Sequence, residues 1–328
     1  MDTGQKLTEQ ELAKLEKRIF TVYQEAYNGL DATIREYFSK FSERDKEMKA
    51  QLDAGKITEE HYRQWRIAQI GRGKRFEALR DQVAERMTNA NATAVAYVND
   101  ATPNIYSLNR NFAAYTIEQL TGDVGFNIWD EQTVKRLISE QPELMPYYPE
   151  KRALNRGIDL AYGKKQITAS VTSSILQGRS IKGMADDLQS RITTMNRDSA
   201  IRTARTAVTG AQNAGRLDSY YAAEKMGIKC RKQWMATLDG RTRHSHATLD
   251  GEIVDNDKKF SNGCRYPGDP NGPPSEIYNC RCTLVSEIEG TDTSGGKRRA
   301  RNQATGRNEL IENMSYAEWA GWKKKNGR

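Results

Sequence analysis

The sequence predicts a mainly α-helical protein with long N-terminal helices and a small α+β module toward its C-terminal end. Apolar residues such as Leu12, Leu15 and Ile19 recur every three or four positions, which is the spacing of one helical face. After Gly227 the pattern changes to short strand-like stretches, and half of the eight prolines fall in residues 267–274. Only 37% of the residues are hydrophobic, which is typical of helices with large exposed faces.

The N-terminal region, residues 1–150, is expected to be helical. Its helical pattern covers most of the first hundred residues, with a predicted stop at Gly55 and a new start at Thr58. The first proline is Pro103, so we expect the preceding helix to end near Val98 and the rest of the region to be less regular.

Residues 151–289 are expected to form a second domain, with helices first and a small sheet after them. Four alanines along its helical part, Ala200, Ala204, Ala207 and Ala211, would allow another helix or a sheet to approach closely. The loop that holds the four prolines cannot be a helix or a central strand. The strands that we expect around this Cys- and Pro-rich loop cover residues 230–237, 253–254 and 280–285.

Residues 290–328 are predicted to be a basic linker followed by a short terminal helix. The last 38 residues hold nine basic and four acidic side chains, which is most of the net charge of +8. Lysine and arginine pair with DNA phosphates in a salt-sensitive way that does not depend on base sequence. A solvated tail is the alternative. The candidates for DNA contact are Lys297, Arg298, Arg299, Arg301, Lys323, Lys324 and Lys325.

Several classes of protein do not fit the sequence. It has no apolar run of about 18 residues, so we expect no membrane helix. The charged N-terminal segment lacks the apolar stretch of a secretory signal. The four cysteines all lie between Cys230 and Cys282, and without a secretory context they favour metal binding or buried thiols over disulfides. A G-x-x-x-x-G-K-[ST] phosphate loop is absent, so NTP hydrolysis is not expected.

Residues 195–285 contain an ordered set of motifs. The set comprises Trp234, Asp239-x-Arg241-x-Arg243, His246, Leu249-Asp250-Gly251, Phe260, Tyr266-Pro267-Gly268-Asp269-Pro270 and Asn279-Cys280-Arg281-Cys282. In this order the motifs resemble the phage Mu protein F-like family, which includes head morphogenesis proteins of the SPP1 gp7 type. Asn213-x-x-Arg216, before Trp234, resembles the family's preceding helix, and Met314 to Trp319 resemble a common family ending.

This resemblance implies a minor capsid protein of a bacteriophage, present in few copies and without enzymatic activity. Its implied partners are the portal protein and the capsid and scaffold proteins, with packaged double-stranded DNA as a further partner for the basic tail. The implied location is the virion, in the head interior or at the portal vertex, after assembly in the host cytoplasm. The implied role is to assist head assembly or DNA delivery.

The residues of the motif set allow two interpretations of their own. In the first, His246, Cys264, Cys280 and Cys282 supply the four ligands of a structural zinc ion. In the second, the cysteines are buried thiols and the charged residues pair with one another to hold a loop that has little core of its own. This predicted network consists of Trp234, Asp239, Arg241, Arg243, His246, Asp250 and Glu276.

Two functions from other classes are alternatives to the head-protein interpretation. Asp239, His244, His246 and Asn279 could form a metal-dependent nuclease site, in which a histidine activates water and a metal ion holds phosphate. A non-specific DNA-binding protein of the head interior is the other alternative, and it rests on the basic tail.

Overall fold

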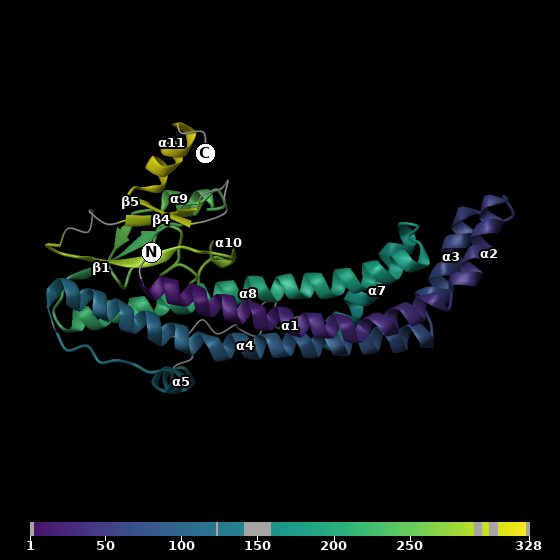
Figure 1. The fold of residues 1–328 in the computed structure, drawn as a ribbon, viewed down its shortest axis with the longest axis horizontal. Helices are drawn as coiled ribbons and strands as arrows, with labels where there is room; N and C mark the ends of the chain where they lie inside the picture. Colours follow the sequence, from purple (N-terminus) through teal and green to yellow (C-terminus); the bar gives the residue numbers. More distant parts are fainter. Residues whose placement is uncertain (1–2, 123, 141–158, 292–296, 302–307, 326–328) are drawn as a thin grey trace. The chain divides into compact units, whose positions relative to one another are not determined.

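The computed structural model of the protein describes residues 3–122, 124–140, 159–291, 297–301 and 308–325 (Figure 1). The chain forms two compact units. Unit 1 comprises residues 1–15, 98–148 and 202–328, and unit 2 comprises residues 16–97 and 149–201. This division does not follow the consecutive ranges 1–150, 151–289 and 290–328, because three long helices contribute to both units. They are α1 (Thr3–Ser39), α4 (Lys74–Thr121) and α8 (Ile181–Lys225).

Unit 2 consists of helices joined by short turns, with no strand among its described residues. Besides its parts of the long helices it contains α2 (Ser42–Asp53), α3 (Glu59–Ile70) and α7 (Leu160–Leu176). The predicted boundary between α2 and α3 is confirmed. Gly55 follows α2 with a φ of +68°, and the Thr58 side chain accepts a hydrogen bond of 3.1 Å from the His61 backbone N–H at the start of α3.

A buried ion pair fixes α2 and α3 within unit 2. The Arg66 guanidinium donates to the Asp45 carboxylate at 2.9 Å and to the Arg179 carbonyl at 2.6 Å. The Tyr62 hydroxyl donates to the same carboxylate at 2.9 Å. The pair therefore has additional hydrogen bonds, which buried charges need in order to be tolerated. The apolar core of this unit includes Ile19, Tyr23, Ile34, Phe38 and Val83.

Helix α4 continues through Pro103, so the prediction that it ends near Val98 is wrong. A proline inside a helix costs about 3 kcal/mol, because it removes one hydrogen bond and its ring crowds the preceding turn. Buried residues beyond the proline, including Ile105, Tyr106 and Ile117, offset this cost. Helix α5 (Glu131–Glu140) follows, and residues 141–158 lie outside the described part of the chain.

The sheet of unit 1 has three antiparallel strands in the order β2-β1-β3. β1 (Cys230–Met235) and β2 (Ile253–Val254) lie where we predicted strands, whereas β3 (Thr283–Ile288) begins three residues later than predicted. Trp234 pairs with Leu284 in register, and both are fully buried. Between the strands lie the short helices α9 (His244–Thr248) and α10 (Pro274–Ile277).

The predicted linker at residues 290–305 contains a strand, which corrects that prediction. β4 (Lys297–Arg301) pairs with β5 (Asn308–Glu312), and α11 (Tyr316–Lys325) follows as the predicted terminal helix. Figure 1 shows α11 next to this strand pair. Ala300 and Trp319 form a small apolar cluster with Leu238. Burial of these apolar side chains stabilises the segment, which its polar composition did not suggest.

Small residues of α8 allow close packing in unit 1, as predicted. Ala204, Ala207 and Ala211 are buried. The proline loop comes so close to α8 that a Cβ at Gly268, where φ is +80°, would lie 2.8 Å from the backbone nitrogen of Gly210. The backbone of α4 approaches α8 in the same way at Gly215, where a Cβ would lie 2.4 Å from the Tyr106 carbonyl oxygen.

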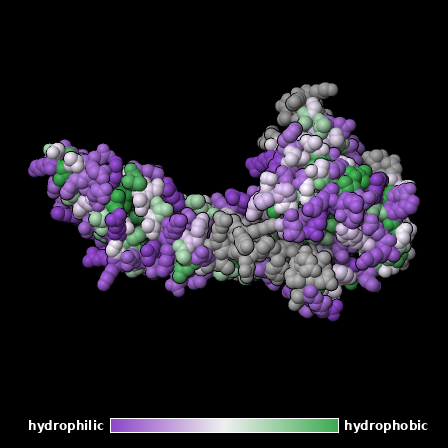
Figure 2. Space-filling view, turned by 180° about the vertical axis from the view of Figure 1, so that it is seen from behind, coloured by the Kyte–Doolittle hydropathy of each residue, from purple (hydrophilic) through white to green (hydrophobic). Residues whose placement is uncertain are grey.

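On the face shown in Figure 2, the coloured residues are mostly hydrophilic, with smaller hydrophobic areas between the polar ones. This agrees with a mean hydropathy of −0.82. Among the described helices, none combines the length and the apolar character needed to cross a bilayer.

Replacing Gly215 with alanine tests the close packing in unit 1. We expect Gly215→Ala to lower the free energy of unfolding by about 1–3 kcal/mol, because the new methyl group meets a carbonyl oxygen that cannot move freely. The matched control is Gly163→Ala in α7, where the new Cβ would meet the nearest side chain at an ordinary 3.6 Å. Thermal unfolding of both variants checks the prediction, and equal midpoints would contradict it.

Candidate functional site

Three potential metal ligands meet inside unit 1. His246 lies on α9, and Cys280 and Cys282 lie just before β3. The Nδ1 atom of His246 is 3.4 Å from the Cys282 sulfur and 3.7 Å from the Cys280 sulfur. One ligand atom from each residue lies within 4.8 Å of the other two, and all three residues are buried. We call these residues the Cys-His cluster.

The opposite edge of the histidine ring faces a carboxylate. Nε2 of His246 lies 3.1 Å from Oε2 of Glu276 on α10, although the alignment is not that of a hydrogen bond. Ser245 donates a hydrogen bond of 3.0 Å to the same oxygen. Trp234 packs edge-on against the ring, with centroids 5.2 Å apart, and Phe260 packs edge-on against Trp234. The imidazole is thus oriented by a carboxylate on one side and by aromatic packing on another.

The two clustered cysteines have opposite pKa shifts. Burial acts to raise the pKa of Cys282, but hydrogen bonding with Cys280 and with His246 outweighs burial and lowers that pKa to about 5. Burial together with the neighbouring Cys282 raises the pKa of the Cys280 thiol well above its usual value. Negative charge is therefore concentrated on the Cys282 sulfur, beside the imidazole.

Helix α8 positions the cysteine segment through its polar side chains. The Thr209 hydroxyl donates to the Cys280 carbonyl at 2.8 Å, and the Asn213 amide donates to the Cys282 carbonyl at 3.2 Å. The Thr206 hydroxyl accepts a hydrogen bond of 3.1 Å from the backbone N–H of Asn279. Asn279 has a φ of +54°, a left-handed conformation that asparagine tolerates better than most residues. This bend turns the chain so that both thiols face His246.

The predicted four-ligand set is only partly brought together. His246, Cys280 and Cys282 converge, whereas Cys264 is not a member of the group of ligand atoms. The Cys264 sulfur lies against Gly272, where it would be 2.5 Å from a Cβ at that position, and burial raises the pKa of this thiol to about 12.

Two carboxylates of the predicted charged network pair with arginines outside it, whereas His246 and Glu276 lie 3.1 Å apart within it. Asp239 forms a bidentate ion pair with Arg281, and Asp250 forms one with Arg298 at 2.9 Å, although neither arginine was placed in the network. Arg243 donates to the Tyr278 carbonyl and Arg241 is exposed. Arg281 is exposed between two buried cysteines, so its charge next to them was a usable signal of an ion pair there.

Asp250 joins the C-terminal segment to the rest of unit 1. Its side chain is only 3% exposed and accepts hydrogen bonds from the backbone N–H groups of Ala236 at 2.8 Å and Tyr316 at 2.7 Å. Arg298 is also buried and donates to the carbonyl groups of Ala236 and Met314. Its guanidinium is thus used inside the protein, which differs from the predicted DNA contact.

The other DNA-contact candidates lie in elements whose backbone alone is described at those positions. Lys297, Arg299 and Arg301 belong to β4, and Lys323, Lys324 and Lys325 belong to α11. Their side chains lie outside the described part of the structure.

The residues of the alternative nuclease site do not converge. The Asp239 carboxylate is held by Arg281 and by the backbone N–H of Arg241 at 2.9 Å. His244 is exposed, whereas His246 is buried among the thiols. Among the described residues, the group of ligand atoms around His246 includes neither Asp239 nor His244.

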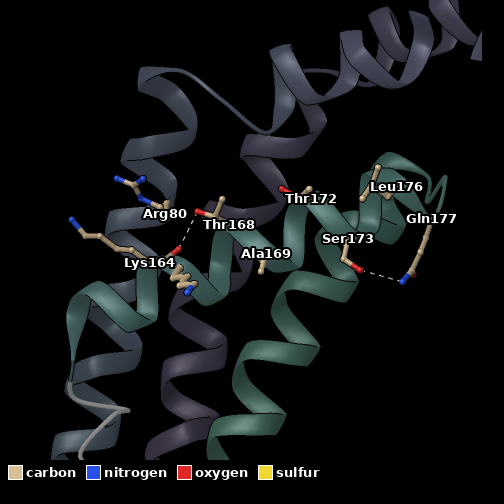
Figure 3. Close-up of a pocket in the computed structure, with 9 residues that line it drawn as sticks. Arg80, Lys164, Thr168, Ala169, Thr172, Ser173, Leu176 and Gln177 are labelled. Atoms are coloured by element: carbon tan, nitrogen blue, oxygen red, sulfur yellow. Dashed lines mark hydrogen bonds between the residues drawn. The ribbon is translucent and has the colours of Figure 1, made fainter. Parts of the chain in front are cut away.

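An open groove lies in unit 2 along α7 (Figure 3). Arg80 of α4 reaches it from one side, and the Lys164 ammonium pairs with Asp81 at 3.0 Å. Its remaining lining residues are Lys165, Thr168, Ala169, Thr172, Ser173, Leu176 and Gln177. Leu176 is half exposed, and this lining of hydroxyl, amide and ammonium groups is typical of a solvated surface.

Comparisons with known proteins agree with the motifs. The sequence model of the family described as phage Mu protein F like protein matches residues 165–285. The minor head protein GP7 of Bacillus phage SPP1 is 28% identical over 320 residues, which cover 95% of this chain and 94% of that protein. No solved structure matches the chain.

Two further relatives match smaller parts. An NAD(+)--arginine ADP-ribosyltransferase, EFV, of Enterococcus faecalis is 31% identical over 157 residues, which cover 47% of this chain but 31% of that protein. The uncharacterized protein YqbB of Bacillus subtilis is 31% identical over 126 residues, or 36% of this chain and 40% of that protein.

Substitution of Asp250 tests its role as the anchor of the C-terminal segment. We expect Asp250→Ala to cost about 3–5 kcal/mol of stability, because it leaves the Arg298 guanidinium buried without its counter-charge. Residues 308–320 should also exchange their amide hydrogens faster, as measured by mass spectrometry. The control Glu289→Ala removes the exposed partner of Lys229 and should leave both measurements unchanged. Unaltered exchange in Asp250→Ala would contradict the prediction.

Proposed function

We propose that the chain, which matches the phage Mu protein F-like family over residues 165–285, associates with the portal protein and the procapsid of its phage. There it assists head assembly or DNA delivery. The observation that carries this proposal is the similarity to the SPP1 minor head protein, which extends over 95% of the chain. A match of that length covers both compact units and not only the motif-bearing module.

The described side chains favour a structural and interaction role over an enzymatic one. The acidic and basic groups of unit 1 that would serve a nuclease hold the fold together, as Asp239 does with Arg281. Several large apolar side chains remain exposed, among them Ile128 at 86% and Met195 at 66%. We place the protein in the virion, in the head interior or at the portal vertex, after assembly in the host cytoplasm.

Co-sedimentation with procapsids tests the portal association. The purified chain is mixed with procapsids assembled with and without the cognate portal protein, and both are sedimented. We expect the chain to sediment with the portal-containing shells, in a few copies per shell, and not with shells that lack the portal.

The same experiment distinguishes the portal protein from the coat and scaffold proteins as the binding partner. Equal binding to both kinds of shell would identify the coat or scaffold protein as the partner in place of the portal. Absence from both pellets, together with absence from purified virions, would overturn the proposed function. Asp250→Ala serves as a variant with a loosened C-terminal segment, and retention of its binding would locate the contact elsewhere in the chain.

A second candidate role, contact with packaged DNA, is favoured by the net charge of +5 in the last 38 residues. We expect binding to double-stranded DNA that weakens steeply as salt increases. Replacing Lys323, Lys324 and Lys325 with glutamine should weaken this binding. It should also make the slope of log K against log salt concentration less steep, by about one for each phosphate that the tail no longer neutralises.

Arg298 is buried in unit 1, and this is why the DNA test uses substitutions and not a deletion of the tail. Deletion of the tail would remove that buried residue and disturb unit 1, so weaker binding after deletion would not be informative. The matched control replaces the exposed Arg44, Lys46 and Lys49 of α2 with glutamine, which makes the same change in net charge. An equal decrease in affinity in both triple variants would show that the tail does not bind the DNA.

A further inference from the structure

We propose that His246, Cys280 and Cys282 bind one Zn²⁺ ion, with Glu276 as the partner of the second histidine nitrogen. This inference goes beyond the proposed function, because it concerns how unit 1 is held together. It also differs from the four-ligand set that includes Cys264. The proposal rests on donor atoms that come from two separate parts of the chain and meet at one point.

The donor set fits zinc in kind and in arrangement. Two sulfurs and one imidazole nitrogen are the ligands that Zn²⁺ prefers, and hard ions such as Mg²⁺ or Ca²⁺ prefer oxygen. The Nδ1 atom of His246 faces both sulfurs, at 3.4 Å and 3.7 Å. Distances of that size are those of ligand atoms arranged around a common centre, since zinc lies about 2.0–2.3 Å from each of its ligands.

Glu276 lies in the position usually occupied by the carboxylate that pairs with the second nitrogen of a zinc-bound histidine. A metal-ligating imidazole usually directs its other N–H to a carboxylate, which fixes the tautomer and the ring orientation. Here Nε2 is buried, lacks a hydrogen-bond acceptor among the described residues and lies 3.1 Å from the Glu276 carboxylate. Ser245 and Asn262 donate to that carboxylate and hold it in place. Zinc on Nδ1 places the proton on Nε2, directly opposite this carboxylate.

Charge balance favours a divalent cation at this position. Ligation through both sulfurs requires both thiols to ionise, and two adjacent buried thiolates would carry two negative charges that the interior beside Trp234 does not solvate. One Zn²⁺ ion neutralises both thiolates. Three protein ligands leave one tetrahedral position, which a water molecule or another external donor would fill.

The ion would join elements that have little apolar core of their own. α9 has five residues and α10 has four, and the Cys-Arg-Cys segment precedes β3 without being part of a strand. A metal ion bound by His246 of α9 and by the cysteines of this segment, with α10 supporting the histidine, would stabilise all three elements. The reason is that metal-binding free energy becomes folding free energy when the site forms only in the folded chain.

Metal analysis of the full-length chain tests the proposal. The protein is purified without chelator, and zinc is measured by mass spectrometry. We expect one zinc ion per chain, and Co²⁺ exchanged into the site should give the absorption bands of a tetrahedral cobalt thiolate. Cys280→Ser, Cys282→Ser and His246→Gln should each lose the bound metal.

The remaining cysteines provide matched controls. Cys230→Ser and Cys264→Ser alter buried thiols of the same unit, and both should retain the zinc content and the cobalt spectrum of the unaltered chain. Retention of the metal by Cys282→Ser would overturn the proposal, as would loss of the metal in Cys264→Ser. We expect Glu276→Gln to keep the site but to weaken zinc binding by roughly 10–100-fold, because it affects the histidine and not the ion directly.

A measurement on the unaltered protein covers the case in which the cysteine variants do not fold. A strong chelator should remove the zinc, lower the midpoint of thermal unfolding and expose Cys280 and Cys282 to thiol reagents, and added Zn²⁺ should reverse all three changes. Equal thermal midpoints and equal thiol reactivity with and without chelator would overturn the proposal. None of these readouts depends on portal binding, so the zinc proposal and the proposed function fail independently.

Discussion

The Asn213 side chain makes the interaction on which the architecture of unit 1 depends. It is fully buried on α8, and its amide group donates to the Pro267 and Cys282 carbonyls while its oxygen accepts from the Leu284 backbone N–H at 2.8 Å. One side chain therefore fixes the proline loop, the cysteine segment and the first residues of β3 to the same helix. Such segments carry unpaired backbone groups that must be satisfied when they are buried, and asparagine offers both a donor and an acceptor.

The elements that follow from periodicity or from capping residues were predictable from the sequence. The break between α2 and α3 was visible in Gly55 and Thr58, and the β1 strand in its alternating pattern. The course of α4 through Pro103 was not predictable, because burial of residues beyond the proline outweighs the local penalty. The β4–β5 pair was missed because β4 contributes a single alanine in a basic run, and this alanine gains its core from Leu238 and Trp319, which are distant in sequence, with Ile311 of β5 packed against them.

At the candidate site, the sequence indicated which residues matter better than how they pair. The cysteines and His246 were recognised as a group, yet nothing in their spacing separates Cys264 from the rest. The partners of Asp239 and Asp250 were assigned incorrectly, because a carboxylate and an arginine 42 or 48 positions apart meet only through the folding of the intervening loop. Motif order identifies a family without specifying its ion pairs, and those depend on tertiary packing.

The sharing of α1, α4 and α8 between both units has a consequence for the order of events during synthesis. Residues 1–15 belong with segments that the ribosome makes last, and Thr8 is tied through Asn109, at 2.7 Å, to Arg216 on α8. The nascent chain thus cannot close unit 1 until most of it has been translated. An incomplete chain would therefore lack the folded unit 1, however much of unit 2 it contained.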